Sequence, residues 1–89
     1  MSRPKELSYE RVRELFTYDT TTDSLISSTH PTRCIKSDGY ISRRLDGRQV
    51  QEHRIVYFYH NPDMDQSLSI DHINGIKHDN RIENLRLVT

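Results

Sequence analysis

Apolar residues recur along this chain in short stretches, which predicts small elements rather than long helices. Ser8 is a good N-cap residue, and the apolar positions after it share one helix face, at Tyr9, Val12, Leu15 and Phe16. We expect a core-facing helix of about two turns that ends near Tyr18-Asp19. The segment SLIS at residues 24–27 then predicts a short strand, and residues 28–38 predict a loop interrupted by Pro31.

The clearest strand signal lies in the middle of the chain, where GYISRRL and RQV flank Asp46-Gly47. This dipeptide suits a tight hairpin because both turn positions must accept a positive φ. In the first strand Arg43 lies on the same face as Ile41 and Leu45, while Arg44 lies on the opposite face. Each face therefore carries an arginine, which is unusual for a strand that packs on a core.

The segment QEHRIVYFYHNP at residues 51–62 fits two structures. Its β-branched and aromatic residues permit a strand, whereas the spacing of Ile55, Val56 and Tyr59 fits a helix face and Asn61-Pro62 fits a helix stop. We favour the helix. We interpret His53 and His60, which lie inside this segment, as structural residues.

The last third of the chain alternates between short strands and polar turns. Residues 67–72 alternate as a strand, Asn74-Gly75 signals a turn, and LRLV at residues 85–88 predicts a final short strand. Residues 76–84 are too polar and uneven for a regular element. These elements together predict an α+β fold.

The length of 89 residues limits the chain to one small domain. A chain of this size buries roughly 60–65% of its extended surface, enough for one thin core, which excludes a multidomain enzyme. We expect a single domain over residues 1–89, with a leading helix and strand in 1–30, a β-hairpin in 38–51 and a functional motif in 67–89. The single Cys34 excludes an internal disulfide and a zinc site built on paired cysteines.

Charge is balanced over the whole chain but not along it. Lys and Arg number 13, as do Asp and Glu, yet residues 31–54 hold six basic and three acidic residues and residues 55–89 hold three basic and five acidic. A basic middle beside an acidic tail suits phosphate binding in one place and cation binding in another, with a solvated charged hairpin as the alternative. The chain has no apolar run long enough to span a membrane and no secretory signal, so we expect an intracellular protein.

The residues that carry chemistry begin with Asp71-His72 at the end of the predicted strand. Their side chains point to opposite faces unless the backbone bends, and a catalytic site built on this pair needs that bend. A carboxylate can hold a hard cation while an imidazole with a near-neutral pKa takes a proton from water. The polar loop that follows returns to LRLV, so an amide side chain could come back beside His72 and fix its tautomer.

Residues 71–89, DHINGIKHDNRIENLRLVT, resemble the HNH homing-type endonucleases of phages, whose ββα-metal site reads DHxNG, then DNRxxNLR and V-T. The upstream segments LSYERVRELFTYD, GYISRRLDGR and HRIVYFYHNP are similar to the family's leading helix, hairpin and pre-site segment. The resemblance therefore covers nearly the whole chain. In that family a helix after V-T carries a His or Asn that completes the metal ligands. The sequence stops at Thr89, so we expect a ββα-metal (HNH) motif that is truncated before its last helix.

The resemblance implies a role for three residues of this motif. Asp71 is expected to be the metal ligand, His72 the general base and Asn84 the residue that orients His72. The implied activity is hydrolysis, by nicking, of double-stranded DNA with one divalent cation, Mg²⁺. For a phage protein the implied location is the cytoplasm of the bacterial host. The alternative is a catalytically inactive relative that binds DNA or a protein partner.

Five arginines are candidates for DNA contact. Arg43, Arg44 and Arg48 on the hairpin are expected to grip the backbone, which positions DNA without reading its sequence. Arg81 and Arg86 flank the loop after His72 and are further candidates for phosphate binding, with surface ion pairs as the alternative. Asn74, His78 and Asn80 are expected to hold this loop by hydrogen bonds from side chain to backbone.

Overall fold

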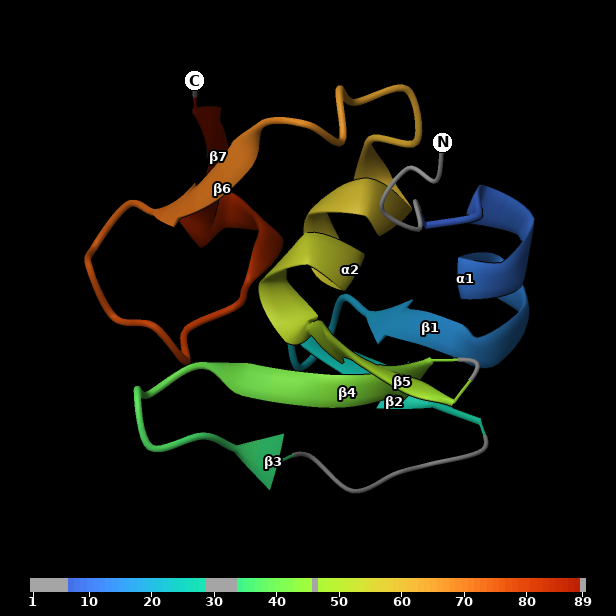
Figure 1. The fold of residues 1–89 in the computed structure, drawn as a ribbon, viewed down its shortest axis with the longest axis horizontal. Helices are drawn as coiled ribbons and strands as arrows, with labels where there is room; N and C mark the ends of the chain where they lie inside the picture. Colours follow the sequence, from blue (N-terminus) through green and yellow to red (C-terminus); the bar gives the residue numbers. More distant parts are fainter. Residues whose placement is uncertain (1–6, 29–33, 46, 89) are drawn as a thin grey trace, which may run out of the picture.

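The computed structural model describes residues 7–28, 34–45 and 47–88 (Figure 1). Helix α2 (Glu52–His60) lies in the middle of the molecule, with helix α1 (Tyr9–Leu15) on one side and the last hairpin on the other. The strands form three separate antiparallel sheets, β1–β2, β3–β4–β5 and β6–β7. This arrangement of two α-helices and several short strand pairs confirms the predicted α+β class.

Helix α1 begins where the sequence predicts and ends earlier. The Ser8 hydroxyl accepts a hydrogen bond from the Arg11 amide, as expected of an N-cap residue. The helix ends at Leu15, however, and Phe16–Asp19 forms strand β1 instead of a last helical turn. Pairing with β2 (Ser24–Ser27) overrides the helical spacing, since Phe16 stands opposite Ser27 and becomes almost fully buried.

The middle hairpin forms as predicted. Strand β4 (Ile41–Leu45) pairs with β5 (Arg48–Gln51), and Leu45 stands opposite Arg48 across the turn. Gly47 has a φ of +80°, the left-handed conformation that this turn requires, while Asp46 lies outside the described residues. The two-residue strand β3 (Cys34–Ile35) adds to the edge of β4, inside a segment predicted to be a loop.

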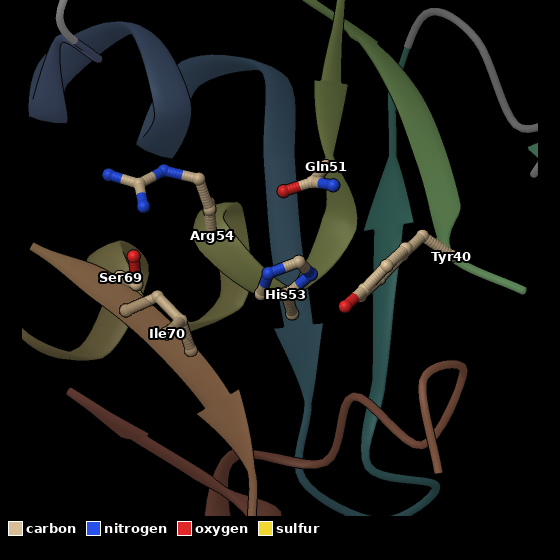
Figure 2. A pocket seen from close by; sticks show the side chains of 6 residues that line it. All are labelled: Tyr40, Gln51, His53, Arg54, Ser69 and Ile70. Atoms are coloured by element: carbon tan, nitrogen blue, oxygen red, sulfur yellow. The ribbon is translucent and has the colours of Figure 1, made fainter. Parts of the chain in front are cut away.

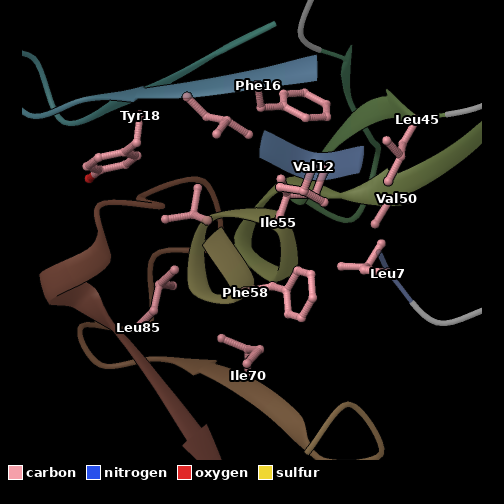
Figure 3. Close-up of a cluster of buried hydrophobic side chains, with 12 residues drawn as sticks. Leu7, Val12, Phe16, Tyr18, Leu45, Val50, Ile55, Phe58, Ile70 and Leu85 are labelled. Atoms are coloured by element: carbon pink, nitrogen blue, oxygen red, sulfur yellow. The ribbon is translucent and has the colours of Figure 1, made fainter. Parts of the chain in front are cut away.

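Helix α2 confirms the helical interpretation of residues 51–62 and supplies the centre of the core. Ile55, Val56 and Phe58 are at most 2% exposed. Figure 3 shows Ile55 and Phe58 surrounded by apolar side chains from α1, β1, the middle hairpin and the last hairpin. All the described elements except β3 therefore meet around one helix, which agrees with the single small core expected from the chain length.

The last hairpin carries the motif of interest. Strands β6 (Ser69–His72) and β7 (Leu85–Val88) pair so that Asp71 faces Arg86 and His72 faces Leu85. The loop between them is irregular, as predicted, apart from a single 3₁₀ turn at Ile82–Asn84. Both strands pack against α2 (Figure 1), which places the end of β6 beside the first turn of that helix.

No helix among the described residues combines the length and apolar character needed to cross a membrane.

Candidate active site

Strand β6 delivers Asp71 and His72 to opposite faces of the last hairpin, as alternation along a strand requires. The side chain of Asp71 is 45% exposed, whereas His72 is only 7% exposed. The carboxylate therefore faces solvent. The imidazole turns inward, toward α2 and the polar loop.

Asp71 forms an ion pair with the residue directly opposite on β7. Both Nε and Nη2 of Arg86 donate to Oδ2 of Asp71, at 3.1 and 2.9 Å. The Arg86 side chain is 61% exposed, so this is the surface ion pair that the sequence left as the alternative to phosphate binding. A pair this exposed contributes little stability and is readily exchanged.

His72 is held by Asn80. Nε2 of His72 lies 2.6 Å from Oδ1 of Asn80, and Nδ2 of the same amide donates to Oε1 of Glu52 at 2.9 Å. A carboxylate only accepts hydrogen bonds, so the NH₂ of Asn80 must face Glu52 and its oxygen must face His72. Nε2 of His72 therefore carries the proton, and Nδ1 keeps the lone pair that a general base needs.

Asn84, which the sequence assigned to orienting His72, makes other contacts. Its Oδ1 accepts from the Asn74 amide at 3.1 Å, and its Nδ2 donates to Oδ1 of Asn74 and to the Asp79 carbonyl at 2.9 and 2.8 Å. Its carbonyl accepts from the Ile73 amide. Asn84 thus ties together the two ends of the loop, because it lies in the 3₁₀ turn that closes it, and the amide beside His72 comes from Asn80 instead.

The loop is held partly as the sequence predicted. Oδ1 of Asn74 accepts from the Ile76 amide, the expected bond from side chain to backbone. Asn80, by contrast, bonds to two side chains and spans from the loop to α2.

Arg81 forms ion pairs at this surface, which is the alternative to phosphate binding that the sequence left open. It donates to both oxygens of Asp79, at 2.8 and 3.0 Å, and to Glu83 at 3.1 Å. The hydrogen bonds from Arg81 hold the pKa of Asp79 well below its usual range. The Arg81 side chain is 47% exposed, so it remains open to solvent.

Arg43, predicted to touch DNA, is buried instead. It is 2% exposed because it shares the core-facing side of β4 with Ile41 and Leu45. Its Nη1 donates to Oε2 of Glu52 at 2.7 Å and to the Leu25 carbonyl at 2.9 Å. The structure thus removes Arg43 from the DNA-facing set. Arg44 on the opposite face is exposed, and the side chain of Arg48 lies outside the described part of the structure.

A second histidine lies against His72. The ring centroids of His53 and His72 are 4.8 Å apart, and the Tyr40 ring lies 5.5 Å from His53 and 6.0 Å from His72. Burial lowers the pKa of His53 to about 4, with the neighbouring His72 and Arg54 adding to the effect. His53 is therefore neutral near pH 7. His60 packs on Tyr18 and lies within hydrogen-bonding distance of the Val56 carbonyl, as a structural histidine would.

A pocket of about 240 Å³ opens beside His53. Figure 2 shows His53 at the start of α2, with Tyr40 on one side and the β6 residues Ser69 and Ile70 on the other. Nδ1 of His53 is buried and has no hydrogen-bond partner among the residues that the structure describes. Arg54 also lines the pocket, but its guanidinium is already bonded to the carbonyls of Gln66 and Leu68.

The described residues contain no group of three His, Cys, Asp or Glu side chains placed to hold a metal ion. Asp71 does fit a hard divalent cation in its chemistry, since it offers a half-exposed carboxylate. It lies on the opposite face of β6 from His72, so the bend that would bring the two side chains together is not present. A cation bound to Asp71 would take its remaining ligands from groups other than the described His, Cys, Asp and Glu side chains.

Local sequence patterns did not predict that three residues, Glu52, Asn80 and His53, would surround His72. Glu52 is equally explained by the preference of helix first turns for acidic residues. Asn80 and His53 are likewise ordinary in a loop and in a helix. Their contacts join positions far apart in the chain, so no spacing rule could have found them.

Residues 50–89 match the HNH endonuclease family. Comparisons with curated proteins and with solved structures gave no match. The matched segment spans α2, the last hairpin and the loop that holds His72, which is the part of the chain that builds the site described above. The match covers 40 of the 89 residues, so it shows a likeness of this segment to the HNH endonuclease family. The match suggests a nuclease-like site in this segment.

Proposed function

We propose that this protein is an HNH-type endonuclease that nicks double-stranded DNA, with His72 as its general base. The observation that carries the proposal is the hydrogen bond from His72 Nε2 to Asn80 Oδ1, which leaves the lone pair on Nδ1. A general base needs an unprotonated ring nitrogen, and this hydrogen bond provides one on Nδ1. The family match over residues 50–89 supports the same conclusion independently.

In the proposed reaction, Nδ1 of His72 takes a proton from water while the water oxygen forms a bond to the scissile phosphorus. The bond from phosphorus to the 3′ oxygen breaks, and the leaving oxygen takes up a proton from solvent. General-base catalysis of this kind is worth about 10²- to 10⁴-fold in rate. Asn80 keeps the imidazole oriented throughout.

Asp71 is the proposed protein ligand of a divalent cation, Mg²⁺, which when bound would stabilise negative charge on the phosphate. We expect Arg86 to leave the Asp71 carboxylate and bind a DNA phosphate when cation and substrate bind, because the side chains of both Asp71 and Arg86 are partly exposed to solvent. Asn84 is proposed to act on the site by closing the loop that carries Asn80.

The proposed DNA surface lies on the exposed side of the middle hairpin. The buried Arg43–Glu52 ion pair removes one basic and one acidic residue from the surface of residues 31–54. The net charge of this segment, +3 from six basic and three acidic residues, is therefore the same without the pair. Arg44 is the cation on that exposed side assigned to phosphate contact, and Arg81 and Arg86 extend the set at the loop. Arg48, whose position stands opposite Leu45 at the hairpin turn, stays a proposed phosphate contact. Contacts of this kind give position and salt-dependent affinity rather than sequence reading.

A plasmid-nicking assay with Mg²⁺, and with EDTA as the metal-free control, tests the proposal. His72→Ala should lower the nicking rate by at least about a hundredfold. His78→Ala is the matched control, because His78 is an exposed histidine of the same loop and should retain activity. Absence of nicking by the wild-type chain, or nicking that survives His72→Ala, would refute the catalytic assignment.

If nicking is absent, a mobility-shift experiment across a salt series separates the two remaining functions. DNA binding that weakens as salt rises would indicate a non-catalytic DNA-binding member of the family. No binding at low salt would leave binding to a protein partner.

A further inference from the structure

We infer that Glu52, held in place by Arg43, is a positioning residue that sets the tautomer of His72 through Asn80. This inference rests on the proposed function, since it explains how the general base keeps its lone pair on Nδ1. Four side chains from four parts of the fold form one continuous buried chain of hydrogen bonds: Arg43 on β4, Glu52 on α2, Asn80 in the loop and His72 on β6.

Every member of this chain is protected from water. Arg43 and Glu52 are each 2% exposed, and Asn80 and His72 are each 7% exposed. Donor-to-acceptor distances along the chain are 2.7, 2.9 and 2.6 Å. Water therefore does not compete for these groups, and each must satisfy its neighbour.

The direction of every bond follows from the first member. A guanidinium can only donate, so Glu52 must accept from Arg43. A carboxylate can only accept, so Asn80 must turn its NH₂ toward Glu52 and its oxygen toward His72. Only the Nε2–H tautomer of His72 can then complete the chain.

Pairing with Arg43 does not by itself account for the orientation of the Glu52 carboxylate. In the contacts between described residues, Arg43 donates to Oε2, while the second oxygen, Oε1, accepts from Asn80. A residue placed only to neutralise Arg43 has no reason to aim its other oxygen at the amide that holds the candidate base. Among the described residues, the rings of His53 and Tyr40 also lie against His72, with centroids 4.8 and 6.0 Å away rather than in hydrogen-bonding contact.

The substitution Glu52→Gln makes the argument testable, because glutamine has the same shape with one acceptor instead of two. Arg43 will take the single amide oxygen, so the glutamine NH₂ will face Asn80. Asn80 must then turn its oxygen toward residue 52 and its NH₂ toward His72. Nε2 of His72 becomes an acceptor, and the proton moves to Nδ1.

The measurement is a long-range ¹H–¹⁵N correlation spectrum of the full chain with ¹⁵N-labelled histidine, recorded at alkaline pH. A protonated ring nitrogen resonates far upfield of an unprotonated one, so the spectrum reports the tautomer directly. Loss of one signal set in His72→Ala assigns the ring. We expect Nε2–H in the wild type and Nδ1–H in Glu52→Gln.

Two further variants protect the test against a folding defect. Asn80→Leu, close in shape, removes the amide, and we expect the two nitrogen shifts of His72 to move toward each other because both tautomers become populated. Asn61→Leu is the matched control, since it removes a part-buried amide that bonds to the Tyr57 carbonyl at the other end of α2 and should leave the tautomer unchanged. Nδ1–H in the wild type, or an unaltered Nε2–H tautomer in both Glu52→Gln and Asn80→Leu, would overturn the inference.

Kinetics then connects the tautomer to the proposed reaction. Glu52 is buried and away from the DNA-facing cations, so Glu52→Gln should lower kcat by at least about a hundredfold while KM for DNA stays the same. The spectra do not depend on nuclease activity. An inactive wild type with the expected tautomers refutes the proposed function alone, whereas an active wild type whose tautomer ignores both variants refutes this inference alone.

Discussion

Removing the Glu52 carboxylate should destabilise the protein strongly, because it leaves the Arg43 guanidinium without its ion-pair partner in the interior. The pair is 2.7 Å long, and its side chains are 1% and 3% exposed. Breaking a buried pair at one partner costs about 3–5 kcal/mol. A chain of this length has a free energy of unfolding of roughly 4–13 kcal/mol. Glu52→Ala should therefore remove a large fraction of that free energy.

The double variant Arg43→Met/Glu52→Leu should lose much less stability than either single change. It removes both charges and keeps apolar volume in their place, which is often nearly neutral for a buried pair. What remains is the cost of leaving Nδ2 of Asn80 without its acceptor, about 1–3 kcal/mol. The expected coupling between the two positions is therefore several kcal/mol.

Urea unfolding followed by far-ultraviolet circular dichroism measures these free energies, since the chain has no tryptophan for fluorescence. Thermal melts provide a second measure, and Glu52→Ala should lower Tm by more than about 10 °C. A loss below about 1 kcal/mol in Glu52→Ala, or additive effects in the double variant, would refute the description of this pair as a buried and mutually dependent unit.

Three further outcomes are expected. The folded state lowers the pKa of His53 to about 4, whereas the unfolded pKa is near 6.5. The stability that this ring contributes is therefore present above about pH 6.5 and lost as the pH falls toward 4. The urea midpoint of His53→Phe should depend less on pH between these two values than the wild-type midpoint does. Ile55→Ala should cost about 2–5 kcal/mol because Ile55 is fully buried, whereas Ile35→Ala, at a residue 67% exposed, should change the unfolding free energy by less than about 0.5 kcal/mol. In DNA titrations across salt, Arg44→Ala should reduce the slope of log affinity by about one, while Arg11→Ala, which removes a cation from α1, should leave that slope unchanged.

Local patterns in the sequence account for most of the secondary structure. The strand at 24–27, the turn at Gly47, the helix of residues 52–60 and the strand at 85–88 each formed where spacing and turn residues placed them. The end of α1 differs from the position that the spacing predicts. The Tyr9–Phe16 spacing fits a helix, but Phe16 gains its burial by pairing in a strand, and only the partner strand decides between the two.

The sequence by itself determined the family motif, the α+β class and the fact that Asp71 and His72 face opposite ways, because all three follow from neighbouring residues. Only the tertiary structure decided that Arg43 is buried and that Asn80 rather than Asn84 lies against His72. These outcomes depend on contacts between β4, α2 and the loop, where the partners of Asn80 are 28 and 8 positions away. The packing of α2 brings these groups together, and the chain of donors and acceptors that results is a property of the fold.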